Sequence, residues 1–244
     1  MTDSVDRGSD LETLRRRLRT SRLANVVLGV ATILLVVVLF SDGGPGNDAS
    51  PVADDTPAVS DELPAVRRDP ADQAALGPVD APVVLVEWID FRCPFCAVFT
   101  NEVFPTLVGE YVDSEQIRIE VIPVAFFGDE STDAAVAAHA AGEQGKFFEF
   151  MEVVYASAPE SGRAELPRER LVELAVEAGV PDAARFAGDL EREDLRRKVS
   201  LDTVMAQQVG VSSVPFFVIG ESGFAGAQPV DVFRGFIDQA VAGA

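Results

Sequence analysis

The two cysteines of this 244-residue chain stand three positions apart, in the segment Cys93-Pro94-Phe95-Cys96, directly after the apolar run 83–89. The run predicts a buried strand, and Pro94 favours the first turn of a helix because its φ is fixed and it has no N–H to leave unpaired. We expect Cys93 at the start of that helix, exposed and nucleophilic, since free backbone N–H groups and the helix dipole lower the pKa of a thiol there. Cys96, one turn further on, is expected to be more buried. The pair can therefore cycle between dithiol and disulfide.

Two other interpretations of the cysteine pair remain open, an inert structural crosslink and part of a metal site. A disulfide across so short a loop restrains the unfolded chain very little, which disfavours a purely structural role. A structural zinc site uses four protein ligands, whereas the chain has no further cysteine and a single histidine, His139. Cu(I) prefers cysteine and methionine, but the methionines are scattered. We therefore expect thiol–disulfide chemistry at a Cys93–Cys96 pair, with no bound metal or other cofactor.

Residues 23–40 form a stretch without a charged side chain, between Arg22 and Asp42. At about 1.5 Å per residue, a helix of this length nearly spans the roughly 30 Å hydrocarbon core of a bilayer. Arginines precede the stretch and aspartates follow it, so the positive-inside rule keeps the N-terminus in the cytoplasm and translocates the rest. We predict an uncleaved transmembrane anchor. A cleaved signal peptide is the alternative, although no Ala-x-Ala site follows closely.

Two polar segments flank the predicted anchor. Residues 1–22 form a basic cytoplasmic N-terminus whose arginines act as topology signals and contact lipid head groups. Residues 41–80 are rich in Asp, Pro, Ala and Gly and carry nine acidic side chains against two arginines. Because this segment lacks a periodic apolar pattern, we expect an extended, self-repelling tether. It would hold a folded domain away from the membrane.

The remaining residues, 81–244, are numerous enough for one domain with its own hydrophobic core. They hold 27 acidic and 12 basic side chains, and the net charge of the whole chain is −20. Such an acidic surface disfavours binding to nucleic acid or to anionic lipid. The segment contains no Gly-rich phosphate loop, dinucleotide fingerprint or Ser/His/Asp set. The chemistry that it indicates is therefore that of the two cysteines.

Hydrophobic periodicity predicts that this domain is mixed α/β. The predicted elements are a strand at 83–89, a helix at 94–111, a strand at 117–124, helices within 129–208, strands at 215–220 and 224–228, and a helix at 230–241. The phenylalanine-rich stretch 146–156 is expected to pack in the core rather than to bind a ligand. The order is β-α-β, a block of helices, then β-β-α.

Four segments resemble the DsbA-like branch of the thioredoxin superfamily. They are Ala81 to Cys96 (APVVLVEWIDFRCPFC), Ala140 to Phe148 (AAGEQGKFF), Gly210 to Ile219 (GVSSVPFFVI) and Gly226 to Pro229 (GAQP). The resemblance covers about residues 70–244. It implies a thioredoxin-like α/β fold with a helical insertion at about 129–208, here preceded by a single transmembrane helix.

The resemblance also implies roles for individual residues. The implied catalytic residues are Cys93, Cys96, Pro215 and Glu87, and the implied substrate contacts are Val214, Pro94 and Phe95. Pro215 would be a cis-proline facing the dithiol, next to a Val214 backbone that pairs with an extended substrate. Glu87 would be a buried acid that moves the proton of Cys96. The alternatives are a trans turn proline at 215 and a solvated strand-edge acid at 87.

Three further positions qualify this picture. Arg92 would stabilise the Cys93 thiolate, though only weakly if its charge is exposed. His139 is expected to pack or to lie at the surface rather than to act in catalysis. Enterobacterial-type DsbA has histidine where this chain has Phe95, so the resemblance does not imply the same oxidising strength.

By this resemblance, the chain is expected to be a thiol–disulfide oxidoreductase, and the apolar stretch 23–40 with its flanking charges would make it membrane-anchored and extracytoplasmic. It would introduce disulfides into reduced secreted or envelope proteins, and a quinone-linked membrane partner would reoxidise it. The alternative within the same chemistry is a reductase or isomerase that runs in the reducing direction. The alternative from another class is a copper-carrying dithiol module. No nucleic acid is expected among the partners.

Overall fold

The computed structural model describes residues 65–159 and 161–244. The predicted cytoplasmic N-terminus (1–22), membrane anchor (23–40) and first part of the tether (41–64) lie outside these residues. Within the described ranges, no helix is both long and apolar enough to cross a membrane. The elements are β1 (Ala75–Leu76), β2 (Val83–Ile89), α2 (Pro94–Glu102), α3 (Phe104–Leu107), the π-helical turn η1 (Val108–Val112), β3 (Ile117–Pro123), α4 (Asp129–Gly142), α5 (Phe147–Ala156), α6 (Arg168–Glu177), α7 (Ala183–Asp189), α8 (Glu193–Gln208), β4 (Phe216–Ile219), β5 (Ser222–Ala225) and α9 (Val230–Gly243).

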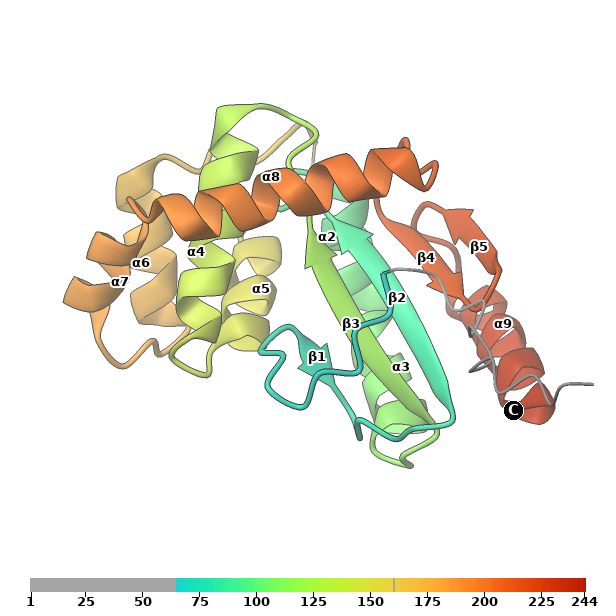
Figure 1. Cartoon of the computed structure of the whole chain (residues 1–244). Helices are drawn as coiled ribbons and strands as arrows, with labels where there is room; N and C mark the ends of the chain where they lie inside the picture. The colour runs from blue at the N-terminus through green and yellow to red at the C-terminus, as the bar shows by residue number, and fades with distance from the viewer. Residues whose placement is uncertain (1–64, 160) are drawn as a thin grey trace, which may run out of the picture. The chain divides into compact units, whose positions relative to one another are not determined.

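The strands form one mixed sheet in the order β1-β3-β2-β4-β5 (Figure 1). β2 and β3 are parallel, with Val83 opposite Ile117 and Ile89 opposite Pro123, and the other neighbouring strands are antiparallel. β2 is buried along its whole length, as is typical of a central strand covered by helices. The carboxyl end of β2 therefore delivers the residues that follow it to a fixed point at the edge of the core.

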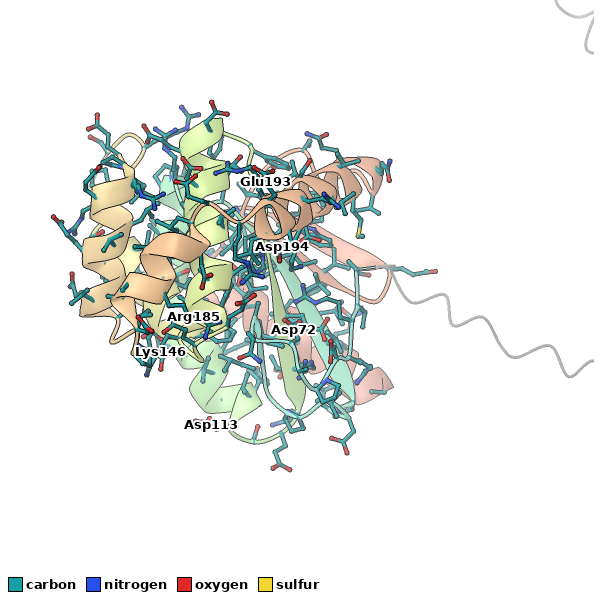
Figure 2. All side chains as sticks on the ribbon, turned by 60° about the vertical axis from the view of Figure 1, so that its left-hand side comes forward. Asp72, Asp113, Lys146, Arg185, Glu193 and Asp194 are labelled. Carbon is teal, nitrogen blue, oxygen red and sulfur yellow. The ribbon has the colours of Figure 1, made fainter. Side chains whose placement is uncertain are left out.

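Helices α4 to α8 occupy the range predicted for the helical insertion. α4 lies at its centre and contacts α5, α6, α7 and α8, which its small alanine side chains allow. Phe147, Phe150 and Met151 of α5 are buried, as expected of core residues. Charged side chains such as Lys146 and Arg185 point outward from this region (Figure 2). α8 extends from the insertion to the sheet, where it contacts β3 (Figure 1).

The single helix predicted over 94–111 is broken into α2, α3 and η1. Pro105 explains the break, because it has no N–H to donate to the carbonyl four residues earlier and its ring clashes with that turn. α2 ends at Val103, whose N–H donates to the Phe99 carbonyl at 2.9 Å. The apolar periodicity continues through this point, so it did not reveal the break. The second hairpin strand also begins earlier than predicted, at Ser222 rather than at 224.

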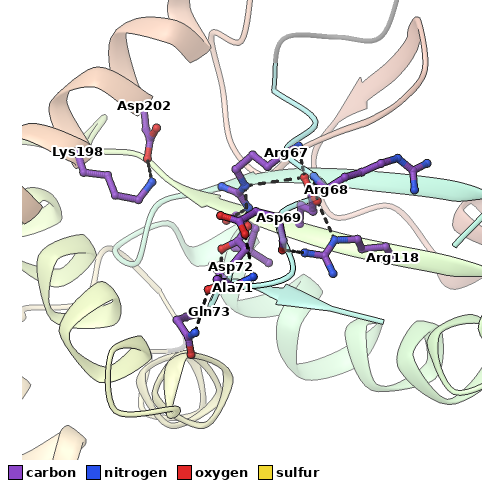
Figure 3. A network of polar contacts seen from close by, with 12 residues as sticks. Arg67, Arg68, Asp69, Ala71, Asp72, Gln73, Arg118, Lys198 and Asp202 are labelled. Carbon is purple, nitrogen blue, oxygen red and sulfur yellow. Dashed lines mark hydrogen bonds and ion pairs between the residues drawn. The ribbon is translucent and has the colours of Figure 1, made fainter. Parts of the chain in front are cut away.

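Residues 65–80, predicted as part of the tether, are attached to the domain (Figure 3). β1 extends the sheet by pairing with β3. Glu120 of β3 is fully buried and accepts hydrogen bonds from the backbone N–H groups of Arg67 at 2.7 Å and Arg68 at 2.8 Å. It also accepts one from Nε of Arg118 at 2.8 Å. The structure thus differs from the prediction, and residues 65–80 belong to the folded domain.

The Arg118 guanidinium completes this attachment. It donates to the carbonyls of Gly77 at 3.0 Å and Asp69 at 2.7 Å, so one buried side chain holds two separate points of the segment. Gly77 has a φ of +91°, and a Cβ there would lie 2.6 Å from the Ile117 carbonyl oxygen. Only glycine fits so close to β3. These contacts are made by backbone groups and a buried ion pair. They do not require an apolar pattern in residues 65–80, so the pattern did not predict that the segment is folded.

Candidate active site

The two cysteines lie at the junction of β2 and α2, both as free thiols. Cys93 is the N-cap of α2, and its N–H donates to the Asp90 carbonyl at 2.9 Å. Cys96 lies in the first turns of the helix and is fully buried, as expected. Cys93 is only 4% exposed, less than predicted, because the chain around Val214 passes beside its sulfur. The nucleophile is therefore reached through a shaped opening and not from open solvent.

The environments of the two thiols push their pKa values apart. A hydrogen bond from the Cys96 thiol, together with the N–H groups of Cys96 and Phe95, lowers the pKa of Cys93 to about 7. Burial and the negative charge of Asp90 act in the opposite direction and raise this pKa. Burial, together with the hydrogen bond to Cys93 and the charge of Cys93, raises the pKa of Cys96 well above its usual range. Near neutral pH, Cys93 is thus the thiolate of the pair and Cys96 the thiol.

The loop before β4 brings Val214 and Pro215 to the cysteine pair. The peptide bond between them is cis, as the resemblance implies. The Sγ of Cys93 donates to the Val214 carbonyl oxygen at 3.3 Å, across 121 residues of sequence. The backbone of Val214 therefore lies beside the reactive sulfur, where an extended chain could pair with it.

An open groove of about 930 Å³ leads to Cys93. Val214, Pro94 and Phe95, the three residues expected to contact substrate, all line it. Phe95 is 62% exposed and thus presents an apolar face at the rim. The groove also reaches the 125–127 loop after β3 and the 210–213 loop after α8. A ligand here would touch the thioredoxin-like core on one side and the end of the insertion on the other.

Glu87 is buried in the middle of β2, opposite Val121 of β3 and Phe217 of β4. Neither carboxylate oxygen has a hydrogen-bond partner among the described residues. Burial raises the pKa of Glu87 well above its usual range, and its charge contributes to the raised pKa of Cys96. The alternative of a solvated strand-edge acid is therefore wrong. A carboxyl with a raised pKa, within electrostatic reach of Cys96, suits the proton transfer expected of it.

Asp90 is a site residue that the sequence reasoning missed. Its carboxylate is fully buried, and it accepts hydrogen bonds from the backbone N–H groups of Arg92 at 2.9 Å and Phe126 at 2.8 Å. Its carbonyl accepts one from the hydroxyl of Tyr155 in α5 at 3.1 Å. Burial raises the pKa of Asp90, and these backbone donors partly offset that effect. An acid at the end of a buried strand, three residues before the dithiol, was the available signal.

Arg92 acts differently from the prediction. Its guanidinium binds two loops, where it donates to the carbonyls of Ala164 at 2.9 Å and Phe127 at 3.0 Å. It also forms an ion pair with Glu130 at 3.2 Å. Arg92 therefore joins the segment before Cys93 to the loop after β3 and to the loop between α5 and α6.

His139 is buried in the packing of α4. Burial, with the nearby positive charges of Lys198 and Arg67, lowers the pKa of His139 to about 3, so the imidazole is neutral and contacts the Phe147 ring. The described residues contain no group of three or more histidine, cysteine or carboxylate side chains placed to hold one metal ion.

The model of the thioredoxin family matches residues 70–239 of this chain. The chain belongs to the thioredoxin family. A probable disulfide bond formation protein D from Bacillus cereus is 33% identical over 147 residues, which cover 59% of this chain and 68% of that protein. Disulfide bond formation protein D of Bacillus subtilis is 25% identical over 151 residues, covering 61% and 68%.

Solved structures show the same fold. Oxidised BdbD from Bacillus subtilis superposes with a TM-score of 0.65 at 23% identity, over 70% of this chain and 93% of that one. A thioredoxin-like oxidoreductase from Silicibacter pomeroyi gives a TM-score of 0.61 at 26% identity, covering 72% and 95%. Together with the curated relatives, these make this member of the thioredoxin family a DsbA-type protein disulfide oxidoreductase. The expected thioredoxin-like fold is thereby confirmed.

Proposed function

We propose that this protein is a dithiol oxidase that introduces disulfides into reduced secreted or envelope proteins, with Cys93 as the attacked sulfur. The observation that carries the proposal is the asymmetry of the pair. Cys93 borders the groove and has a pKa lowered to about 7, whereas Cys96 is fully buried and its pKa is raised. A stable thiolate at Cys93 makes it a good leaving group, which favours release of oxidised substrate.

The first step begins from the Cys93–Cys96 disulfide. A substrate thiolate attacks the Sγ of Cys93, a bond forms between these two sulfurs, and the bond between Cys93 and Cys96 breaks. Cys96 leaves with the electron pair. Its raised pKa drives it to take a proton. We propose Glu87 as the source of that proton, because its own pKa is raised and its charge influences Cys96. The backbone of Val214 would hold the substrate segment in an extended conformation during the attack.

The second step releases the product. A second thiolate of the substrate attacks the substrate sulfur of the mixed disulfide, and Cys93 leaves as a thiolate. The substrate has then lost two electrons and two protons, and the protein holds the Cys93/Cys96 dithiol. Pro94, Phe95 and Pro215 would shape the surface on which the substrate turns toward this attack. Regeneration needs an external oxidant, for which we propose a quinone-linked membrane partner, as in the family that the chain resembles.

The location follows from the N-terminal sequence. We propose that residues 23–40 are an uncleaved anchor and that the dithiol domain lies outside the cytoplasm, where disulfides persist. The charge asymmetry around the segment supports this orientation. Cell fractionation with mass spectrometry of the N-terminus tests it. A soluble secreted form that begins after residue 40 would contradict the anchor and leave the chemistry untouched.

Single-cysteine variants test the assigned order. Cys93→Ser should abolish oxidation of a reduced, unfolded protein, because it removes the attacked sulfur. Cys96→Ser should also lose the oxidase reaction. Given a protein substrate that holds a disulfide, the variant's Cys93 thiolate should attack that disulfide, release one substrate thiolate and accumulate as a mixed disulfide, since the variant has no second thiol to resolve it. Non-reducing electrophoresis and peptide mass spectrometry identify the linked sulfur. Equal trapping by both variants would refute the order.

The direction of electron flow needs a separate measurement. The fraction of reduced Cys93/Cys96 pair is determined at a series of ratios of reduced to oxidised glutathione. For an oxidase, the pair should become reduced at ratios that leave ordinary structural disulfides intact. A pair that remains oxidised at those ratios would instead support a reductase or isomerase.

A further inference from the structure

The groove beside Cys93 has an unusual charge for this protein. The whole chain has a net charge of −20, yet none of the residues that line the groove is acidic. Its walls are mainly apolar, with Phe95, Phe126, Phe127 and Val211, and the hydroxyls of two serines add polarity. Arg163, in the loop between α5 and α6, is the one charged residue in this lining.

Arg163 has no ionic partner among the described residues. Eleven other arginine and lysine side chains of this part of the chain form ion pairs with Asp or Glu. The guanidinium carbon of Arg163 instead lies 4.1 Å from the centroid of the Phe127 ring. A cation stacked on an aromatic ring keeps its charge and its hydrogen-bond donors available to a ligand.

The position of this cation relative to the reactive sulfur is set by Arg92. The Arg92 guanidinium donates to the carbonyl of Phe127, whose ring supports Arg163. It also donates to the carbonyl of Ala164, the residue that follows Arg163. Arg92 is itself the residue before Cys93. The cation, the ring under it and the nucleophile therefore share one anchoring side chain, which limits their relative motion.

We propose that Arg163 is a specificity-determining residue, which selects protein substrates that carry an aspartate or glutamate close in sequence to the reactive cysteine. The inference rests on the proposed role of the groove as the substrate site. Elsewhere the acidic domain repels an anionic segment, whereas in the groove a carboxylate would meet a fixed guanidinium next to an apolar surface. Pairing the carboxylate with Arg163 would also offset its tendency to raise the pKa of the neighbouring substrate thiol.

Two matched cysteine peptides test this selection. They are identical except for glutamate or glutamine two residues from the cysteine, and each is reacted with the full-length protein in its disulfide form. The readout is the ratio of the two second-order rate constants at low salt. We expect the glutamate peptide to react about threefold faster, the size expected of a solvent-accessible ion pair. The ratio should fall toward one at high salt, because exposed charges are screened.

Two variants complete the experiment. Arg163→Gln should bring the ratio to one or below, whereas Arg163→Lys should retain part of the preference because it keeps the charge. Arg197→Gln is the control: Arg197 also has no ion pair among the described residues, but it lies on α8 away from this groove, so the ratio should match that of the wild type. A preference unchanged in Arg163→Gln, or absent in the wild type, would overturn the inference. Failure of both peptides to react with the wild-type protein would count against the proposed function itself.

Discussion

The Oδ2 of Asp90 lies 2.8 Å from the backbone nitrogen of Phe126 and joins the strand that leads to the dithiol to the loop that forms one wall of the groove. The other oxygen of the same carboxylate accepts the N–H of Arg92. Asp90 therefore fixes two backbone segments that must keep their spacing for a substrate to reach Cys93. It also places a negative charge near that sulfur, which raises the pKa of Cys93.

Asp90→Asn separates these two effects. An amide offers one acceptor oxygen, so one of the two N–H groups loses its partner, at a cost of about 1–3 kcal/mol in the free energy of unfolding. Loss of the charge should lower the pKa of Cys93 below about 7. Urea unfolding measures the first effect, and the ultraviolet absorbance of the thiolate as a function of pH measures the second. A destabilised variant with an unchanged Cys93 pKa would leave Asp90 a structural role only.

The pH dependence of the reduced protein should report Cys93. Since the thiolate is the reactive form, alkylation of native Cys93 should be half-maximal at about pH 7, with Cys96 protected. The lowered pKa of Cys93 also stabilises the folded state. This contribution is fully present above about pH 8.5, the pKa of a cysteine in the unfolded chain, and is lost as the pH falls through about 7. It amounts to about 2 kcal/mol at most. Cys93→Ser, measured in parallel by urea unfolding, should lack this rise in stability between neutral and alkaline pH.

Glu87→Gln should change kinetics and stability in opposite senses. Because burial raises the folded pKa of Glu87, the acid contributes stability at low pH that is lost as the pH rises through that folded pKa. Glutamine removes this loss, so the variant should be at least as stable as the wild type near neutral pH. The steps in which Cys96 gains or loses its proton should slow by about tenfold or more.

Glu102→Gln is the control for Glu87, because Glu102 is an exposed acid at the end of the helix that carries Cys96. It should leave rates and stability unchanged. Stopped-flow oxidation of a reduced peptide across the neutral range supplies the rates. Wild-type rates in Glu87→Gln at every pH would show that the acid takes no part in the proton transfer.

Glu120→Ala should release residues 65–80 from the sheet. The change leaves the buried Arg118 and the N–H groups of Arg67 and Arg68 without their acceptor, at a cost of about 3–5 kcal/mol. Limited proteolysis should then cut this segment, and urea unfolding should show the loss of stability. Glu149→Ala, which removes an exposed pair with Lys146, should cost less than about 1 kcal/mol and leave the segment resistant. Equal resistance of both variants would argue that Glu120 does not hold the segment.

Much of the fold was predictable because its signals are local. The run 83–89 is a buried strand with the predicted bounds, and Pro94 opens the helix with Cys93 as its N-cap. The helical insertion begins and ends at the predicted residues. Pro105 was also a local signal for the break after α2, but the continuous apolar pattern led to the prediction of one helix.

The site likewise has features that local sequence predicts and features that depend on long-range contacts. The sequence alone determined which residues carry the chemistry, because the Cys-Pro-Phe-Cys spacing, the preceding strand and the acid within it are features of adjacent residues. Only the tertiary structure decided that Val214 covers the sulfur of Cys93, that Arg92 binds Ala164 and not the thiolate, and that Glu120 holds residues 65–80. Each of these contacts joins residues more than fifty positions apart through single hydrogen bonds or ion pairs. Such contacts depend on where the packed core places each backbone segment, and no local periodicity records that placement.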